Sequence, residues 1–424
     1  MNSYLFKDIV VGKEGLLKGP FGSDLKKDLY IQKSTKAYKV YLQENILKEN
    51  NFVGEYYISE EYYNKKMSRY AVKEGDFIVT CDGTLGEIFQ LKNISEKGII
   101  SSSLLRITLN NEIVDNDYFY YLFKAIIKRQ LITQGNNSVL KHLPGLEVIR
   151  NHSIKLHNLT EQKKIGNILK KIDDKIKNNN KINSELENMA KTIYDYWFLQ
   201  FEFPNDKGNP YKSSGGKMVW NEELKKEIPE KFNRMVLKNI DGITIITGKT
   251  PSTKEEDNFG NDVMFITIED LRKNTFIVDT NRKLSIKGAN TQKNKYIPKG
   301  SICVSCIATI GEIAISTENS QTNQQINSII AKEIKIRNYL YFCLKNIFSN
   351  FRVKSGNIFS NMNKEEFENI KILLPNDEVL GKFYESINSL FIKIEKNTKE
   401  IRELTSLRNY LLPLLMNGQI GFKD

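Results

Sequence analysis

Gly75-Asp-Phe-Ile-Val-Thr-Cys-Asp-Gly-Thr-Leu-Gly-Glu-Ile88 recurs 225 residues later as Gly300-Ser-Ile-Cys-Val-Ser-Cys-Ile-Ala-Thr-Ile-Gly-Glu-Ile313, with seven of the fourteen positions identical and no gap. Each copy is followed, after a variable stretch, by a segment with the hydrophobic repeat of a long helix. The pattern predicts one unit present twice, a globular domain plus a long helix. A duplicated unit suits a partner with twofold symmetry, and duplex DNA is the obvious candidate.

The composition agrees with a multidomain protein that binds a polyanion. A chain of 424 residues suits two or three domains, and 40% hydrophobic residues can build their cores. The formal net charge of +12 favours nucleic acid, because lysines placed on phosphates release condensed counterions. A Lys- and Asn-rich composition would also account for this charge. With no apolar run of about 18 residues, no signal peptide pattern and no disulfide framework, we expect a reduced, cytoplasmic chain without a membrane span.

The globular segments are predicted to mix short strands with helices. Residues 77–81 and 104–109 are typical of strands, and 118–131 predicts a helix with one apolar face. The equivalent helix of the second copy is predicted near 337–351. Polar loops follow both helices, at 134–138 and 355–358.

Two long helices are the strongest local prediction. Apolar residues alternate by four and three positions, which is the seam of a coiled coil. The first seam contains Ile165, Leu169, Ile172, Ile176, Asn179, Asn183, Leu186, Ala190, Ile193 and Trp197, and the second contains Phe383, Ile387, Leu390, Ile394, Asn397, Ile401 and Leu404. Thr160 and Glu161 are expected to open the first helix and Gly418 to end the second. Each helix is expected to be roughly 50 to 60 Å long.

Asn179 and Asn397 interrupt the two seams at matching places. A buried polar seam residue costs stability but fixes the register of a helix pair. In an antiparallel pair with aligned centres these two residues would face one another. The alternative is that both are exposed asparagines in an Asn-rich chain.

Glycine, proline and serine at Gly208-Asn-Pro210 and Ser213-Ser-Gly-Gly216 indicate a linker. The expected organisation is a first domain at 1–158, a first helix at 159–203, a linker at 204–232, a second domain at 233–374 and a second helix at 375–418. The expected fold class is mixed α+β, with two pseudo-repeated domains separated by the antiparallel helix pair.

Two segments resemble catalytic or metal-binding motifs but lack the spacing or the partners that those motifs need. Gly242 and Gly248-Lys249-Thr250 are separated by five residues where a phosphate-binding loop has four. Cys303 and Cys306 have metal-site spacing but no second pair, so two small buried side chains are expected instead. Because neither a methyltransferase motif nor a nuclease core is recognisable, we expect no catalytic residues, no metal and no cofactor.

Several segments, in this order, resemble the specificity subunits of type I restriction–modification systems. The central conserved region of this family is similar to Leu159-Thr-Glu-Gln-Lys163, Tyr194-Asp-Tyr-Trp-Phe198, Phe201-Glu-Phe-Pro204 and Gly216-Lys-Met-Val-Trp220. Its distal conserved region is similar to Leu407-Arg-Asn-Tyr-Leu-Leu-Pro-Leu-Leu-Met-Asn-Gly418. Gly19-Pro-Phe-Gly-Ser23 and Gly248-Lys-Thr-Pro-Ser252 are similar to the openings of its two target-recognition domains. The resemblance covers essentially the whole chain.

The resemblance implies a non-catalytic subunit in which an antiparallel pair of helices holds two target-recognition domains apart. Each domain is expected to read one half of a bipartite, gapped DNA site. The resemblance also implies double-stranded DNA, two adenine methyltransferase subunits and restriction–translocase subunits as partners. Tyr194, Tyr196, Trp197 and Phe198 are expected at a subunit interface, where aromatic residues are enriched.

Polar and basic residues in matching loops are the candidate DNA contacts, because such side chains reach base edges or phosphates. In the first copy they are Ser23, Lys26, Lys27, Gln134, Asn136, Asn137, Ser138 and Lys141, and in the second Thr250, Ser252, Lys254, Ser355, Asn357, Ser360, Asn361 and Lys364. Plain solvated loops are the alternative for any one of them. For the whole chain, the alternatives are a solitary two-headed DNA-binding or scaffold protein without enzymatic partners, and a fused modification–restriction enzyme.

Overall fold

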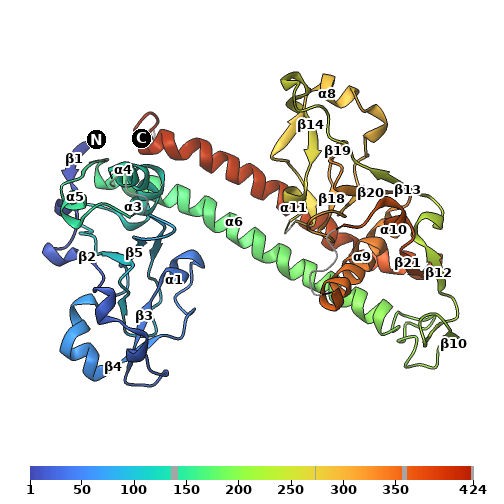
Figure 1. Cartoon of the computed structure of the whole chain (residues 1–424), viewed down its shortest axis with the longest axis horizontal. Coiled ribbons are helices and arrows are strands. Elements are labelled where there is room, and N and C mark those ends of the chain that lie inside the picture. Colours follow the sequence, from blue (N-terminus) through green and yellow to red (C-terminus); the bar gives the residue numbers. More distant parts are fainter. Residues whose placement is uncertain (135–141, 273, 356–360, 422–424) are drawn as a thin grey trace. The chain divides into compact units, whose positions relative to one another are not determined.

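The computed structural model describes residues 1–134, 142–272, 274–355 and 361–421. They form two compact units, Met1–Asp174 with Leu404–Asp424, and Lys175–Glu403. Both units combine sheets with helices (Figure 1). The mixed class expected from the sequence is confirmed.

The first unit is built on a four-stranded antiparallel sheet. Its strand order is β2 (Leu16–Lys18), β8 (Leu104–Ile107), β5 (Phe77–Thr80) and β6 (Ile88–Gln90). A second sheet has the order β4 (Tyr57–Ser59), β3 (Ala37–Tyr41) and β7 (Gly98–Ile100), and a third pairs β1 (Asn2–Leu5) with β9 (Ser153–Leu156). The helices are α1 (Gln43–Leu47), α2 (Glu60–Tyr62), α3 (Asn116–Leu122), α4 (Lys128–Gln134) and α5 (Leu146–Arg150).

The second unit repeats this plan. Its main sheet has the order β13 (Ile243–Thr247), β20 (Ile326–Ala331), β17 (Ile302–Ser305), β18 (Ile313–Ser316) and β15 (Phe276–Ile277). Its smaller sheets are β16 (Arg282–Leu284), β14 (Phe259–Ile266) and β19 (Ser320–Thr322), and the pair β12 (Asn233–Val236) with β21 (Lys371–Leu374). The helices are α7 (Ile268–Leu271), α8 (Ile286–Asn290), α9 (Ile334–Ser355) and α10 (Lys364–Glu368).

The duplication read from the sequence is therefore a duplication of topology. Each main sheet contains the same four antiparallel neighbours in the same order, and each three-stranded sheet contains one parallel pair, β3 with β7 or β14 with β19. The predicted helix over 118–131 is α3, a π turn at Phe123–Ile127 and α4, and its counterpart is α9.

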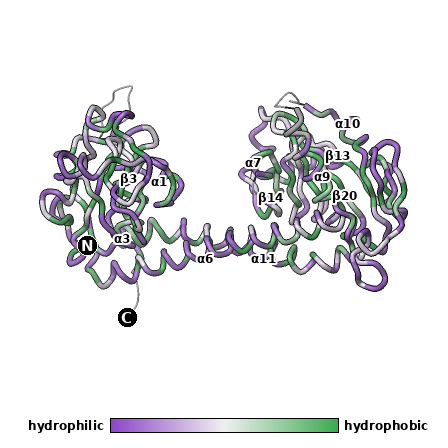
Figure 2. Tube along the Cα trace, turned by 90° about the horizontal axis from the view of Figure 1, so that it is seen from below, coloured by the Kyte–Doolittle hydropathy of each residue, from purple (hydrophilic) through white to green (hydrophobic). Residues whose placement is uncertain are grey.

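The long helices are α6 (Leu159–Tyr194), continued by a π turn at Asp195–Leu199, and α11 (Asp377–Met416). Hydrophobic and hydrophilic residues alternate along both (Figure 2). The Asn158 side chain caps α6 by accepting a hydrogen bond from the Glu161 backbone N–H at 2.9 Å. Thr160 thus lies inside α6 and does not open it.

The two helices run antiparallel within each unit. In the second unit, Asn183 bonds to Asn397 and Trp197 contacts Phe383. In the first unit, Arg408 forms an ion pair with Asp173. Moving forward along α6 therefore means moving backward along α11, as predicted.

Residues 204–232, expected as a linker, are folded. They contain the hairpin of β10 (Met218–Asn221) and β11 (Lys226–Pro229), and they bury Ile228 and Phe232 in the core of the second unit. In the described part of the chain, no helix is both long and apolar enough to cross a membrane.

Candidate nucleic-acid interface

The repeated sequence forms the same tight turn in both units, between β5 and β6 and between β17 and β18. The Gly86 N–H donates to the Thr80 carbonyl at 2.9 Å, and the Gly311 N–H donates to the Ser305 carbonyl at 2.9 Å. The Thr80 hydroxyl accepts from the Glu87 N–H at 3.0 Å, and the Ser305 hydroxyl accepts from the Glu312 N–H at 2.9 Å. Although Thr80 and Ser305 are different residues, both supply the hydroxyl that accepts this hydrogen bond.

Gly86 and Gly311 are required by these turns. Their φ angles are 69° and 82°, in the region that favours glycine. A Cβ on Gly86 would lie 2.9 Å from Lys128 Cγ, and one on Gly311 would lie 2.6 Å from Phe348 Cβ. Each turn is therefore held against the helix that follows, α4 or α9.

Further loops are tied to these turns by equivalent backbone hydrogen bonds. The Cys81 N–H donates to the Ser103 carbonyl and the Cys306 N–H to the Gln325 carbonyl, both at 2.8 Å. The carbonyls of Cys81 and Cys306 in turn accept from Leu143 at 3.1 Å and from Met362 at 2.7 Å. In each unit, three loops that are distant in sequence meet at the end of the central strand.

A fourth loop joins each group through a glycine. The Gly19 N–H donates to the Leu104 carbonyl at 2.8 Å, and the Gly248 N–H to the Ile326 carbonyl at 3.0 Å. A Cβ on Gly19 would lie 1.9 Å from the Ser101 carbonyl oxygen, and one on Gly248 would lie 2.2 Å from the Asn323 carbonyl oxygen. Only glycine permits this approach.

We call these two groups of loops the first and second loop faces. The first consists of 18–27, 82–86, 101–103 and 142–143, and the second of 248–254, 307–311, 323–325, 361–362 and Arg272, whose guanidinium lies against the 307–311 turn. The frame is the same but the side chains differ. The first face presents exposed Thr84 and an Asp82–His142 pair at 2.5 Å. The second presents Gln324, whose amide oxygen accepts from the Thr250 hydroxyl at 2.5 Å, and Arg272, 3.4 Å from the Thr309 hydroxyl.

Several predicted contact residues lie on these faces. Ser23, Lys26 and Lys27 are exposed on the first, and Ser252, Lys254 and Asn361 on the second, where Thr250 is half-buried. Gln134 ends α4 and is exposed, as is Lys364 at the start of α10. Asn136, Asn137, Ser138, Lys141, Asn357 and Ser360, and the side chain of Ser355, lie outside the described residues.

Sequence reasoning missed part of each face. Ser101–Ser103, Asp82, Arg272 and Asn323–Gln325 are far in sequence from the predicted contacts, whereas His142 directly follows the predicted Lys141. The available signal was the repeat itself, because residues just after each repeated strand had to be brought together with Gly19 or Gly248.

The predicted meeting of Asn179 and Asn397 is wrong by one helical turn. Both are buried, but the Asn397 amide donates to Asn183 at 2.9 Å, and the Asn179 amide donates to Glu400 at 2.9 Å. Lys175 also lies 3.4 Å from Glu400, on the edge of the seam. Glu400 is therefore the partner of Asn179, and the asparagines that bond to one another are Asn183 and Asn397.

The aromatic cluster predicted at a subunit interface lies mostly inside this chain. Tyr194 and Phe198 are buried, and the Phe198 ring lies 4.9 Å from those of Tyr339 and Phe383. Trp197 is half-buried against Phe383. Only Tyr196, 40% exposed, keeps a side chain free to meet another protein. The others join α6 to the core of the second unit.

Cys303 and Cys306 are buried, as predicted. Burial raises the pKa of Cys303 to about 12 and that of Cys306 to about 11, so both are neutral thiols and poor metal ligands. In the part of the chain that the structure describes, His, Cys, Asp and Glu form no group of three that could hold a metal.

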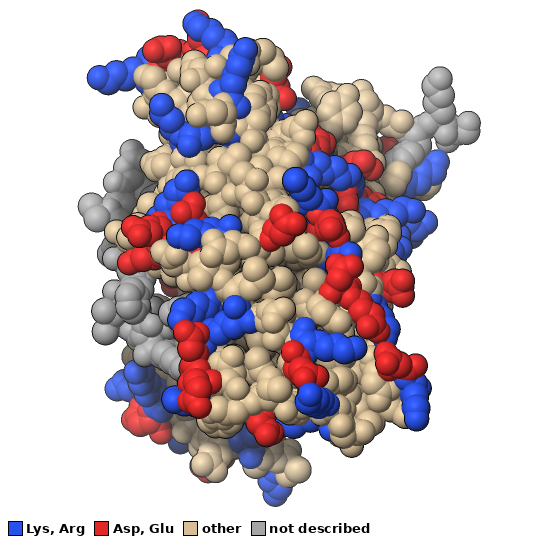
Figure 3. All heavy atoms as spheres, turned by 90° about the vertical axis from the view of Figure 1, so that its right-hand side faces the viewer, with Lys and Arg blue, Asp and Glu red and all other residues tan. Residues whose placement is uncertain are grey.

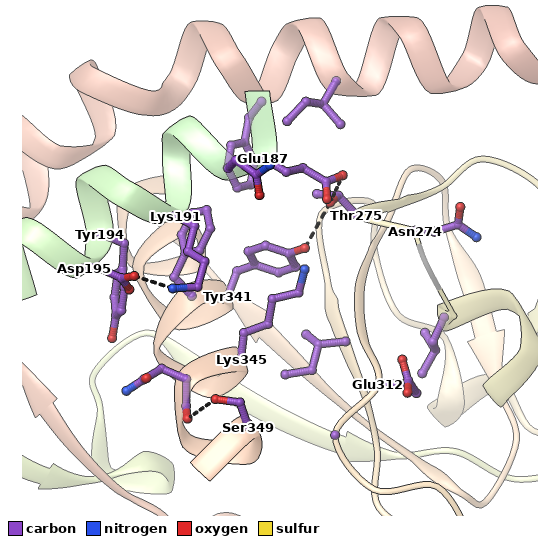
Figure 4. Close-up of a pocket in the computed structure, with 18 residues that line it drawn as sticks. Glu187, Lys191, Tyr194, Asp195, Asn274, Thr275, Glu312, Tyr341, Lys345 and Ser349 are labelled. Carbon is purple, nitrogen blue, oxygen red and sulfur yellow. Dashed lines mark hydrogen bonds and ion pairs between the residues drawn. The ribbon is translucent and has the colours of Figure 1, made fainter. Parts of the chain in front are cut away.

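A cavity of about 540 Å³ in the second unit is lined by residues of α6 and α9 and by Leu271, Asn274 and Thr275 (Figure 4). The Tyr341 hydroxyl donates to Thr275 at 3.1 Å, and the Thr275 hydroxyl donates to Glu187 at 2.5 Å. The Lys345 ammonium lies 4.5 Å from the centre of the Tyr341 ring. Lys124 is placed in the same way over Tyr120 in the first unit. These bonds tie the loop and α9 to α6.

The side of the molecule drawn in Figure 3 has no large patch of one charge. On the face of the molecule in Figure 3, basic and acidic side chains are interspersed among uncharged ones. On this side the net positive charge marks no site, and the loop faces are identified by the repeated geometry instead.

Two copies of one mixed α/β domain, each followed by one helix of an antiparallel pair, define a duplicated-domain protein whose loop faces differ. The model of the type I restriction modification DNA specificity domain matches residues 24–188 and 229–406. The chain therefore belongs to this family, as the resemblance implied.

Relatives and a solved structure agree. The chain is 28% identical over 402 residues to the HindI specificity subunit of Haemophilus influenzae, covering 82% of this chain and 87% of that one. It is 25% identical to the MjaIX specificity subunit of Methanocaldococcus jannaschii, covering 88% and 83%. The crystal structure of the type I system S subunit from M. genitalium matches with a TM-score of 0.60 and 14% identity, covering 100% of this chain and 96% of that one, which shows the shared fold.

Proposed function

We propose that this chain is the non-catalytic DNA-reading subunit of a type I restriction–modification complex and reads a bipartite, gapped site. The observation that carries the proposal is one backbone frame, repeated bond for bond in both units, that presents different side chains on its two loop faces. One frame with two sets of side chains suits two different half-sites. Hydroxyl, amide and guanidinium groups on the faces are the groups that pair with base edges.

The long helices fit the role of a spacer. At 1.5 Å per residue, the 36 residues of α6 extend roughly 54 Å. One turn of B-DNA is about 34 Å, so a spacer of this length can separate two half-sites by at least a turn. The antiparallel pairing of α6 with α11 suits half-sites on strands of opposite polarity.

Two adenine methyltransferase subunits are the proposed partners on the helices, joined by restriction subunits. Met189 on α6 is 54% exposed, and Leu407 on α11 is 46% exposed. Leu407 lies as far beyond Asn397 as Met189 lies beyond Asn179, so the two occupy equivalent positions. Equivalent exposed apolar residues on two related helices favour two copies of one partner.

Co-purification with an adenine methyltransferase subunit from the same organism tests the proposal. The complex should methylate adenines in one gapped motif, and the chain alone with a methyl donor and DNA should methylate none. A chain that binds DNA specifically but retains no methyltransferase would be a solitary DNA-binding or scaffold protein. Methyl transfer by the chain alone would make it an enzyme and overturn the proposal.

A further inference from the structure

Phe21, on the first loop face, is the most exposed large hydrophobic residue of the described chain, with 81% of its surface accessible. An aromatic ring in water forgoes the stabilisation that burial would give it. Phe21 follows Gly19 and the buried Pro20 in the stretch that opens the first domain. The ring is therefore presented by a segment whose preceding residues are fixed in the fold.

The loop around Phe21 is anchored on both sides. Before it, Gly19 bonds to Leu104, as described above. After it, the Asp24 N–H donates to the Phe21 carbonyl at 2.8 Å, and the Tyr62 hydroxyl donates to the Asp24 carbonyl at 2.7 Å. The Asp24 carboxylate also pairs with Lys66 at 2.9 Å. The exposure of Phe21 thus belongs to a braced loop.

The segment that carries Phe21 is mainly cationic and polar. Lys18, Ser23, Lys26 and Lys27 are exposed on it, together with one acid, Asp28. These lysines can hold phosphates on either side of a base step. An apolar ring between such cations is the arrangement by which proteins insert a side chain between stacked bases.

The second unit lacks this feature. Thr250 occupies the position of Phe21 when Gly248 is aligned with Gly19, and its hydroxyl is bonded to Gln324. Thr250 is half-buried and has no ring to insert. The two loop faces therefore differ here in mechanism as well as in hydrogen-bonding groups.

We propose that Phe21 is a wedge that enters a base step of the half-site read by the first unit, unstacking that step while the other half-site stays stacked. The inference rests on the proposed function. It makes sequence-dependent unstacking part of recognition in the first half-site, where flexible pyrimidine–purine steps cost least to open.

The test uses the complex with its methyltransferase subunits and duplexes that contain the methylated motif. 2-Aminopurine is placed in turn at each position other than the methylated adenines, because its fluorescence rises when it unstacks. We expect an increase at one step of the first half-site. In Phe21→Ala the increase should disappear and binding should weaken roughly tenfold, within the range for losing one base–aromatic stack. Phe21→Trp should restore both.

Phe52→Ala is the matched control. Phe52 is 63% exposed in the same unit, but the neighbouring Asn51 bonds to Lys92, beyond the far end of the β5–β6 hairpin. Phe52→Ala and Thr250→Ala should leave the first half-site signal unchanged. Specific binding with an equal signal in Phe21→Ala would overturn the wedge alone. Absence of specific binding by the unaltered complex would overturn the proposed function.

Discussion

At the scale of single residues, Gly19 and Gly22 in the same loop of the first loop face differ in their tolerance of a side chain. A Cβ on Gly19 would overlap the Ser101 carbonyl, at 1.9 Å, whereas a Cβ on Gly22 would meet nothing within 4 Å. Because the obstacle is backbone, the clash can be relieved only by moving the loop. Gly19 is thus a position where substitution acts on one loop face.

We expect Gly19→Ala to abolish discrimination in the first half-site and to spare the second. Affinities of the complex would be measured for duplexes altered in either half. For Gly19→Ala, altering the first half should no longer weaken binding, while altering the second should still weaken it at least tenfold. Gly22→Ala should behave as the unaltered protein. Equal behaviour of the two variants would mean that the 18–27 loop takes no part in reading.

The cysteines give a prediction about pH. Burial raises the pKa of Cys81 and Cys303 to about 12 and that of Cys306 and Cys343 to about 11. Only the thiolate reacts with iodoacetamide, so at pH 8 the native chain should incorporate no label, and the unfolded chain should incorporate four. Mass spectrometry reads both numbers. Rapid labelling of Cys306 at pH 8 in the native chain would show a reactive thiol.

At the scale of elements, the Asn183–Asn397 pair is a buried hydrogen bond between the two seams. Asn397→Ala leaves the Asn183 amide oxygen without this partner and should lower the free energy of unfolding by about 1 to 3 kcal/mol. The double variant Asn183→Leu/Asn397→Leu should lose less than the sum of the single leucine variants, because no amide is stranded. Denaturant midpoints measure this, with exposed Asn188→Leu as a neutral control. Strict additivity would show that the pair is not coupled.

The helix pair also shows how far a sequence can be read. Heptad spacing predicted the two helices, because the apolar seam of each helix can be read from its own sequence. Their antiparallel pairing was implied by the family resemblance. The register of the pair could not be predicted, since it depends on which side chains meet across the two helices. Asn179 bonds to Glu400 and not to Asn397. The aromatic cluster failed for a related reason: Tyr194 and Phe198 find their partners in α9 and α11 of the same chain. Among the contact candidates, the repeat located the faces but not their most exposed ring, Phe21.

At the scale of the whole molecule, the proposed spacer can be lengthened. Seven residues added to α6 near Asn179, and seven to α11 opposite them, keep both seams in phase. The insertions extend the pair by about 10 Å, and at about 3.4 Å per base pair the gap should grow by about three base pairs. Methylation mapping should show both half-sites unchanged. An unaltered gap would contradict the spacer role of the helices.

Exchange of the first domain tests the central claim, that two copies of one backbone frame recognise two independent half-sites. Residues 1–158 include β9, the partner of β1, so the exchanged segment keeps its own sheet edges. They would be replaced by the equivalent segment of a relative with a different motif, and methylated adenines would be mapped genome-wide. The account predicts a motif in which the first half is the relative's and the second half and the gap are unchanged. A motif changed in both halves, with the exchanged protein folded and methylation active, would contradict it.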